Sequence, residues 1–175
     1  MVVSQADTRL YHGGAPGRKP GDLLLPPAET GYRTVEQRWR EELGADVRPW
    51  MEPDRNRADR VYLTARRDLA EAYAMCHELT RGGGGPGVLY LAEPVGELED
   101  DPDLPGLSFQ CASARVLRIY DPCVTMPFAR FERIMLSVVR LFRSQSGHGF
   151  QHLIRRSPVI PGNPVTCGNG LVLCA

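Results

Sequence analysis

The hydrophobic and polar positions of this chain form short runs that predict more strands than helices. Apolar, β-branched and aromatic residues cluster at 8–12, 61–64, 88–92 and 116–120, and polar or turn-forming residues border each cluster. These four segments are predicted to be strands. The segment 93–113 is acidic and rich in proline, so it is predicted to be a long loop.

Apolar residues spaced three or four positions apart predict three helices. The first lies in 34–47, where Thr34 can cap the amino end. The second begins at Thr64, and the third spans 128–143, where arginines flank an apolar face. The apolar face of the second helix consists of Leu69, Ala72, Tyr73, Cys76 and Leu79. This order of strands and helices predicts an α+β fold with little room for repeated βαβ units.

Length and composition predict one domain with a buried core, because the chain has 175 residues of which 42% are hydrophobic. The formal net charge is zero, which gives no general sign of a nucleic-acid or membrane partner. The charge is unevenly distributed, however. Residues 1–125 carry 15 basic and 20 acidic residues, whereas residues 126–175 carry six arginines and one acidic residue. This change indicates a boundary near residue 125.

The cysteine spacing and the composition of the first residues bear on metal binding, on secretion and on the redox state of the thiols. The five cysteines form no Cys-x-x-Cys pair and no metal-ligand spacing with the four histidines, so no metal site is predicted. The first residues show no basic segment followed by an apolar stretch, and no apolar run approaches 18 residues. We therefore expect a cytoplasmic, monomeric protein with reduced thiols, no secretory signal and no membrane span.

His12 ends the first predicted strand and is followed by two glycines. Gly13 and Gly14 would let a ligand approach the backbone closely, so that an amide-bearing ring could pair with main-chain groups. The imidazole could then form a hydrogen bond with a sugar hydroxyl. The alternative is an exposed turn in which the histidine binds nothing.

Two tyrosines are candidates for binding a flat heterocycle. Tyr62 lies in a predicted strand, and Tyr73 follows eleven residues later in the predicted helix. If the helix packs beside the end of the strand, both rings can face one slot. Offset stacking contributes about 0.5–1.5 kcal/mol per aromatic pair beyond burial. The alternative is that both tyrosines are ordinary core residues.

Acidic side chains crowd the predicted loop. Carboxylates this close raise one another's pKa, and one beside an apolar slot could act as a base or stabilise positive charge. The alternative is a solvated acidic loop. The acidic residues are Glu97, Glu99, Asp100, Asp101 and Asp103.

Several common nucleotide-binding and catalytic motifs are excluded. The glycines at 82–85 are not followed by Lys-Ser/Thr, so they do not form a P-loop. The chain has no Gly-x-Ser-x-Gly elbow and no Rossmann fingerprint. A dinucleotide, if bound, would have to be bound in another way.

The order of these segments resembles the His-Tyr-acid branch of the ADP-ribosyltransferases, and most nearly the rifamycin (rifampin) ADP-ribosyltransferases. The similarity covers residues 10–120. The matching segments are His12-Gly13-Gly14, Lys19-Pro20-Gly21-Asp22-Leu23-Leu24, Val61-Tyr62-Leu63-Thr64-Ala65, Glu93-Pro94-Val95-Gly96, Glu99-Asp100-Asp101-Pro102 and Ser113 through Ile119.

The resemblance implies a compact split β-sheet with few helices that uses NAD as ADP-ribose donor without a metal. His12 would hold a ribose hydroxyl, Tyr62 and Tyr73 would enclose the nicotinamide, and Asp101 would be the catalytic acid. Asp100 is the alternative acid if the register is shifted by one. The cofactor-binding set implied is His12, Gly13, Gly14, Tyr62, Thr64 and Tyr73. ADP-ribose would pass to a hydroxyl of a small molecule such as a rifamycin, with release of nicotinamide.

Three departures from that family leave further functions open. Gly14 replaces a threonine, residues 32–58 form an insertion, and the basic extension 125–175, with its helix and irregular tail, has no counterpart in the family. The predicted catalytic domain is therefore 1–124. The insertion and tail favour a protein- or nucleic-acid-directed ADP-ribosyltransferase of the toxin or effector type. An RNA 2′-phosphotransferase and a catalytically inactive NAD-binding or interaction module also stay open.

Overall fold

The computed structural model describes most of the chain between residues 9 and 146. The predicted helix at 34–47, nearly all of the insertion 32–58 and the tail after residue 146 lie outside the described residues. The described ranges are 9–32, 57–76, 79–80, 83–84, 86–102 and 104–146.

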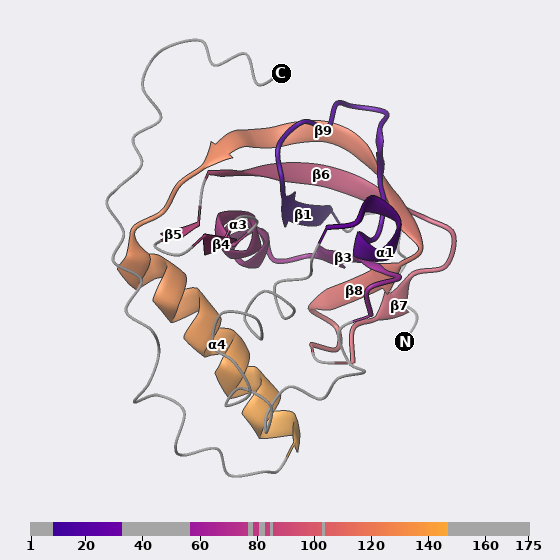
Figure 1. The fold of residues 1–175 in the computed structure, drawn as a ribbon. Coiled ribbons are helices and arrows are strands. Elements are labelled where there is room, and N and C mark those ends of the chain that lie inside the picture. The colour runs from indigo at the N-terminus through magenta and orange to yellow at the C-terminus, as the bar shows by residue number, and fades with distance from the viewer. Residues whose placement is uncertain are drawn as a thin grey trace.

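A seven-stranded sheet forms the body of the protein, and all of its described strand pairs are antiparallel (Figure 1). The predicted mixed α+β class is confirmed. In spatial order the strands are β2 (Leu23–Leu24), β9 (Ser113–Val124), β6 (Gly87–Val95), β1 (Leu10–Gly14), β3 (Val61–Thr64), β8 (Ser108–Cys111) and β7 (Glu99–Asp100). A separate pair consists of β4 (Leu79–Thr80) and β5 (Gly83–Gly84).

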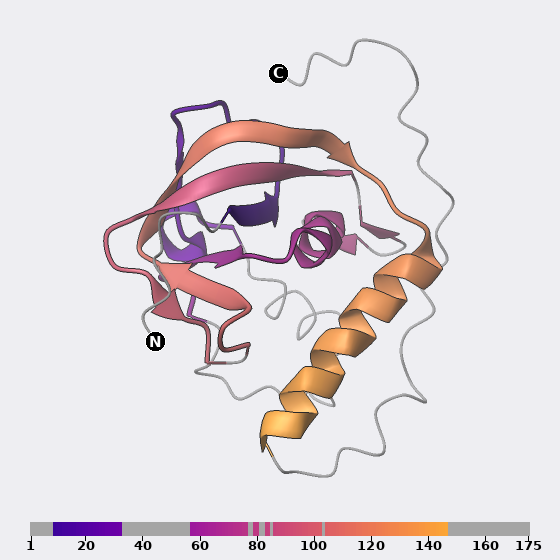
Figure 2. The same ribbon diagram turned by 180° about the vertical axis from the view of Figure 1, so that it is seen from behind.

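Three helices accompany the sheet in the described residues. They are α1 (Pro27–Thr30), α3 (Arg67–Met75) and α4 (Phe128–Ser146), the last in the stretch where the sequence predicts a helix. Figures 1 and 2 show β6 and β9 curving together over α3, while α4 runs along one side of the protein. No helix in the described part of the chain is long and apolar enough to cross a membrane.

Two predictions of local structure are wrong. The helix predicted to run from Thr64 to Leu79 is α3, which ends at Met75, and Leu79 belongs to β4. The Cys76 N–H donates to the Tyr73 carbonyl, a tight closing turn that ends the helix. The predicted loop 93–113 contains the end of β6 and two whole strands, because β7 and β8 pair with one another despite their acidic and polar residues.

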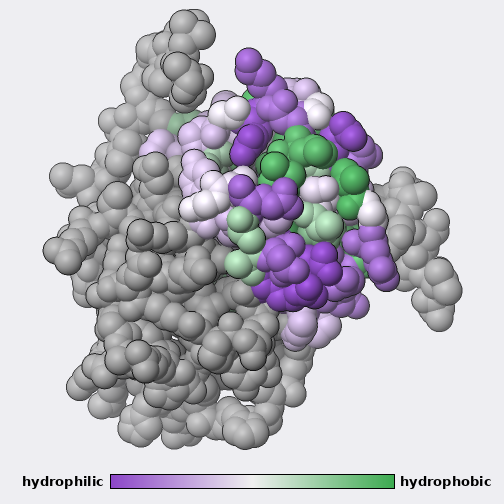
Figure 3. Space-filling model, turned by 45° about the vertical axis from the view of Figure 1, so that its right-hand side comes forward, coloured by the Kyte–Doolittle hydropathy of each residue, from purple (hydrophilic) through white to green (hydrophobic). Residues whose placement is uncertain are grey.

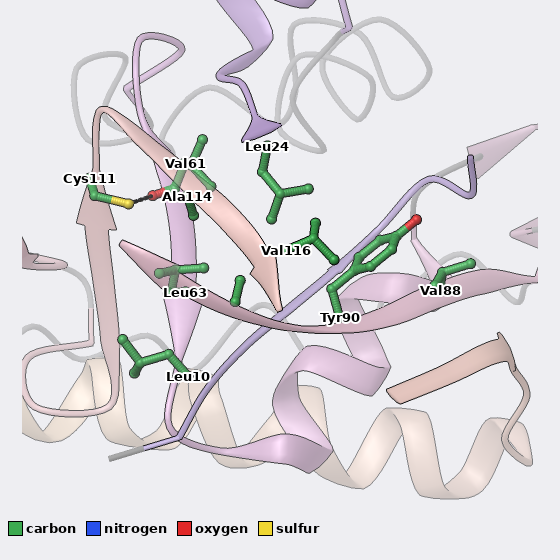
Figure 4. Close-up of a cluster of buried hydrophobic side chains, with 10 residues drawn as sticks. Leu10, Leu24, Val61, Leu63, Val88, Tyr90, Cys111, Ala114 and Val116 are labelled. Carbon is green, nitrogen blue, oxygen red and sulfur yellow. Dashed lines mark hydrogen bonds between the residues drawn. The ribbon is translucent and has the colours of Figure 1, made fainter. Parts of the chain in front are cut away.

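One face of the curved sheet holds the larger apolar core. Leu63, Tyr90 and Val116 are nearly inaccessible to solvent there, and Figure 4 shows how the side chains of this cluster meet. The Cys111 thiol lies 3.7 Å from the Val61 carbonyl in this core. Burial raises the pKa of Cys111 to about 11, so this thiol is protonated at neutral pH.

The opposite face packs against α3 at very short range. A Cβ atom at Gly13 would collide with the Ala70 carbonyl oxygen and lie 2.6 Å from the Ala74 amide nitrogen. A Cβ atom at Gly87 would collide with the Ala74 carbonyl. Glycine in β1 and β6 opposite alanine in α3 therefore sets the distance between helix and sheet.

α4 packs on α3 through apolar and charged contacts. Ile134 of α4 is buried with Leu69 and Ala72 of α3. The carboxylate of Glu71 is 8% exposed and is paired with Arg67 of its own helix and Arg130 of α4, each at 2.8 Å. These contacts attach α4 to the sheet domain through α3.

The cysteines differ in part from the expectation of reduced thiols. Cys76 and Cys111 are free and buried. Cys123 of β9 is disulfide-bonded. The expectation of reduced thiols is therefore wrong for Cys123.

Apolar side chains gather on one side of the protein among polar ones, as Figure 3 shows. Several large hydrophobic residues of the sheet are exposed on the surface. They are Leu23 of β2, Val95 of β6, and Leu117 and Ile119 of β9.

Candidate active site

His12 lies where β1 and β3 separate. All five residues of β1 pair with β6, but β1 pairs with β3 only between Tyr11 and Thr64. Beyond that point the His12 side chain spans the two strands, with its Nδ1 atom 3.0 Å from the Tyr62 carbonyl oxygen. His12 therefore contacts the main chain of Tyr62, while strand alternation places its ring on the face of Tyr90 and the Tyr62 side chain on the opposite face of the sheet.

The contact determines which nitrogen of His12 is protonated. A carbonyl oxygen only accepts hydrogen bonds, so Nδ1 carries the proton and Nε2 is left as an acceptor. Burial lowers the pKa of His12, and this effect outweighs the opposite effect of the bond to Tyr62. The imidazole is therefore neutral at physiological pH, with the lone pair of Nε2 available to accept a hydrogen bond.

Gly14 keeps space beside that nitrogen. A Cβ atom at position 14 would lie 2.7 Å from Nε2 of His12. The two adjacent glycines thus have different roles: Gly13 accommodates α3, and Gly14 accommodates the imidazole. Glycine at position 14 therefore avoids a close contact at Nε2 of His12.

Tyr90 supports His12 and was missed in the sequence. Its ring faces the imidazole across the β1–β6 pair, with centroids 6.3 Å apart and planes inclined by 29°. The Tyr90 hydroxyl donates to the Ala15 carbonyl at 2.8 Å and accepts from the Arg18 N–H at 3.4 Å. Tyr90 therefore connects His12 to the loop that follows β1.

The strand register places Tyr62 and Asp101 on the same face. Tyr62 pairs with Gln110, which pairs with Glu99, while Thr64 pairs with Ser108. The Asp101 N–H donates to the Ser108 carbonyl at 3.0 Å, which continues the β7–β8 register by one residue. Side chains alternate along a strand, so one face carries all of these alternate positions. We call it the polar face; its residues are Tyr62, Thr64, Ser108, Gln110, Glu99 and Asp101.

Alternation also separates the two candidate acids. Asp101 is on the polar face and is 7% exposed. Asp100 lies on the opposite face, is exposed, and its carboxylate accepts the Gly106 N–H at 3.1 Å. Neighbouring strands are about 4.8 Å apart, so Tyr62 and Asp101, two strands apart, are separated by roughly 10 Å across the sheet. A nucleoside-sized group can span that distance.

Buried polar side chains are concentrated on the polar face. Of the five buried polar or charged residues that the structure describes, four lie there: Thr64, Ser108, Gln110 and Asp101. The fifth is Glu71, which is paired with two arginines. Burying polar groups is unfavourable unless they are hydrogen-bonded, so their concentration on one face marks it as the candidate site.

Thr64 and Tyr73 both contact the loop that follows Asp101. The Thr64 hydroxyl donates to the Leu107 carbonyl at 2.6 Å and accepts from the Arg66 N–H at 3.0 Å. It therefore ties the start of α3 to the loop after Asp101. Tyr73 of α3 packs in the apolar cluster that contains Leu104 of the same loop. The structure thus places Tyr73 beside the segment that follows Asp101, and Tyr62 on the sheet.

A hydrogen bond fixes the orientation of the Tyr62 ring: its hydroxyl accepts a hydrogen bond from the backbone N–H of Arg57 at 2.9 Å. Gln110 and Ser108 were missed in the sequence because nothing in Ser-Phe-Gln-Cys marks them as partners of Tyr62 and Thr64. Their significance comes from strand pairing, which local sequence does not reveal.

Comparison with known proteins gives no family assignment: no protein-family model matches the chain, and no curated protein matches it. The chemistry of the site must be argued from its own groups. These are a neutral imidazole with one free acceptor on the face of Tyr90, and an aromatic ring and a buried carboxylate together on the polar face. No group of three His, Cys, Asp or Glu residues in the described ranges is placed to hold a metal.

Proposed function

We propose that this protein is an NAD-dependent ADP-ribosyltransferase that moves ADP-ribose to a hydroxyl of a small molecule and releases nicotinamide. The observation that carries the proposal is the hydrogen bond of His12 to Tyr62, together with the position of Asp101 on the same face as Tyr62. The resemblance of the sequence to the rifamycin ADP-ribosyltransferases supports the same interpretation.

His12 binds the donor through its unprotonated nitrogen. A ribose hydroxyl donates to Nε2, while Nδ1 stays bonded to the Tyr62 carbonyl. Because the imidazole is already fixed between two strands, little side-chain entropy is lost when the sugar binds. The backbone beside Gly13 and Gly14 is where the carboxamide of nicotinamide would pair with main-chain groups.

Tyr62 and Tyr73 form the aromatic surfaces for the nicotinamide ring. Tyr62 is half-buried and has its hydroxyl held by Arg57, so its ring is presented in a fixed orientation. Tyr73 is half-buried and packs against the apolar cluster between α3 and α4. Stacking holds the leaving group flat as its bond to the ribose breaks.

Asp101 stabilises the positive charge that develops on the ribose. The bond between the ribose C1′ and the nicotinamide nitrogen breaks, and its electron pair leaves with nicotinamide. The acceptor hydroxyl oxygen then bonds to C1′ and gives its proton to Asp101 acting as base. A carboxylate in a buried position acts more strongly on the oxocarbenium-like centre than one in water.

The acceptor that we propose is a small molecule with a free hydroxyl, of which a rifamycin is the specific candidate. The first experiment is incubation with labelled NAD and a panel consisting of a rifamycin, cell lysate, tRNA and single-stranded DNA. Label on the rifamycin supports the full proposal. Label on protein or nucleic acid alone corrects the acceptor and leaves the chemistry intact. Absence of both label and nicotinamide release contradicts the proposal and favours an inactive module.

A further inference from the structure

Glu99 is the centre of a polar network beside Tyr62. One carboxylate oxygen lies 3.3 Å from Arg60, and the other accepts from the Gln110 side-chain amide at 3.0 Å. Arg57, whose backbone N–H holds the Tyr62 hydroxyl, has its guanidinium 3.8 Å from Glu99. The network thus joins the segment before β3 to β8 and β7.

The network fixes the orientation of the Gln110 amide. A carboxylate between guanidinium groups accepts hydrogen bonds, so Gln110 must turn its NH₂ toward Glu99 and its Oε1 away from it. Gln110 is 4% exposed, and its Oε1 has no hydrogen-bond partner in the part of the chain that the structure describes. The Nε of Arg60 is the other buried side-chain polar atom without a partner there.

The unpaired Oε1 of Gln110 and Nε of Arg60 can both be satisfied by one hydroxyl group. Gln110 Oε1 is an acceptor, and Arg60 Nε–H is a donor. A hydroxyl both donates and accepts, so it can satisfy an acceptor and a donor together. Buried polar atoms in native proteins are nearly always paired, and an unpaired one calls for an explanation.

Gln110 lies between the residues that would hold the two ends of a nucleoside. It is the direct cross-strand partner of Tyr62, and Asp101 is its diagonal neighbour on the next strand. Diagonal neighbours are about 7–8 Å apart, within the reach of long side chains. A ligand whose ring lies on Tyr62 and whose reacting carbon faces Asp101 must therefore place its sugar over Gln110.

We propose that Gln110, oriented by Glu99, accepts a hydrogen bond from a hydroxyl of the ribose attached to nicotinamide. The Nε–H of Arg60 donates to the oxygen of the same hydroxyl. This inference rests on the proposed function, because it takes NAD as the ligand. It adds a binding residue that the sequence did not indicate, and it assigns a role to two atoms that the protein itself leaves unpaired.

The test is a comparison of binding between protein variants and NAD analogues. The dissociation constants of NAD, and of NAD lacking the 2′- or the 3′-hydroxyl of the nicotinamide ribose, are measured by calorimetry with wild type and Gln110→Met. Loss of a hydrogen bond weakens NAD binding by about tenfold. For one deoxy analogue the Gln110→Met change has no further effect, because the hydroxyl is already missing. The other analogue keeps the tenfold loss.

Matched controls separate binding from folding. Asp100→Asn changes a neighbouring residue on the opposite face and leaves all three constants unchanged. Arg60→Lys keeps the charge beside Glu99 but removes the guanidinium Nε, and it gives the same pattern as Gln110→Met with a smaller loss. If Gln110→Met does not fold, Arg60→Lys alone decides the question.

The outcomes distinguish this inference from the proposed function. Equal loss for all three ligands would show that Gln110 is only structural, as would a loss that follows thermal stability alone. If the wild type binds NAD and Gln110→Met binds all three ligands equally well, this inference fails and the proposed function stands. If the wild type binds no NAD, both fail.

Discussion

Two regions of the same sheet bury their residues in different ways. Under α3, the sheet uses glycine opposite alanine, and helix and strand approach so closely that no Cβ fits at Gly13 or Gly87. On the polar face, the protein buries a threonine, a serine, a glutamine and an aspartate. The first arrangement maximises packing, which stabilises the fold. The second is unfavourable unless the polar groups are hydrogen-bonded, and Gln110 Oε1 has no partner within the described residues, so this face is the candidate site.

The comparison is sharpest at two adjacent glycines, because Gly13 belongs to the packed region and Gly14 to the site.

Gly13→Ala is expected to have the largest effect on stability. Its methyl group would collide with backbone atoms of Ala70 and Ala74, which cannot move without shifting α3. We expect the free energy of unfolding to fall by about 3 kcal/mol, the upper end for overpacking. Urea denaturation followed by circular dichroism measures it, and a change below the experimental error would contradict the packing described for α3.

Gly14→Ala is expected to spare stability and reduce NAD affinity. The three atoms nearest to the added methyl group all belong to the His12 ring, so the clash is with a side chain and not with the backbone. Displacing Nε2 removes one hydrogen bond to the donor, and we expect roughly tenfold weaker NAD binding. Calorimetric titration and urea denaturation on the same sample check both parts. Loss of stability comparable with that of Gly13→Ala would place Gly14 in the packed region instead.

Acidification is expected to act on the site through His12. Burial lowers the pKa of His12 below its ordinary value of 6.5, so the unfolded chain binds a proton before the folded protein does. The contribution of His12 to stability is therefore complete above pH 6.5 and is lost as the pH falls from 6.5 toward the lowered value. Urea denaturation at about pH 7.5 and about pH 5.5 should show a larger loss for wild type than for His12→Gln. Equal losses would mean that His12 is not buried as a neutral ring.

The smallest expected effect is at the contact between α3 and α4. Arg130→Ala removes one of the two partners of the buried Glu71, but Arg130 is half exposed and Arg67 stays in place. Exposed ion pairs contribute little, and we expect a loss of about 0.5–1 kcal/mol. Thermal unfolding of Arg130→Ala beside Arg133→Ala as a matched arginine control measures the difference. If the control loses as much, the ion pair with Glu71 contributes nothing specific.

The sequence predicted the parts of the fold that depend on local pattern. The apolar runs around His12, Tyr62 and Tyr90 are strands, because β-branched and aromatic residues suit a half-buried pleated surface. β7 and β8 were missed, since their acidic and polar residues do not show the apolar alternation that predicts strands, although the two segments pair with one another. Leu79 was assigned to the wrong element because periodicity alone does not show where a helix stops.

The residues of the candidate site were proposed from the sequence, but their arrangement was not predictable from it. His12, Tyr62 and Asp101 follow from their order in the chain, but their mutual placement depends on which residues pair across strands. The choice of Asp101 over Asp100 is an example, because it follows from strand alternation once Asp101 is seen to bond to Ser108. Gln110 had no signal in the sequence, since its position beside Tyr62 arises from the β3–β8 register.

The measurement that tests the central claim most directly is nicotinamide release from NAD by wild type, Asp101→Asn and Asp100→Asn, followed by mass spectrometry. Removing the buried charge that faces the reacting carbon is expected to lower the rate by about 100-fold or more, while NAD binding persists. Asp100→Asn is expected to match wild type, because its side chain lies on the opposite face. Equal rates for wild type and Asp101→Asn, or no release by any of the three proteins, would contradict the account.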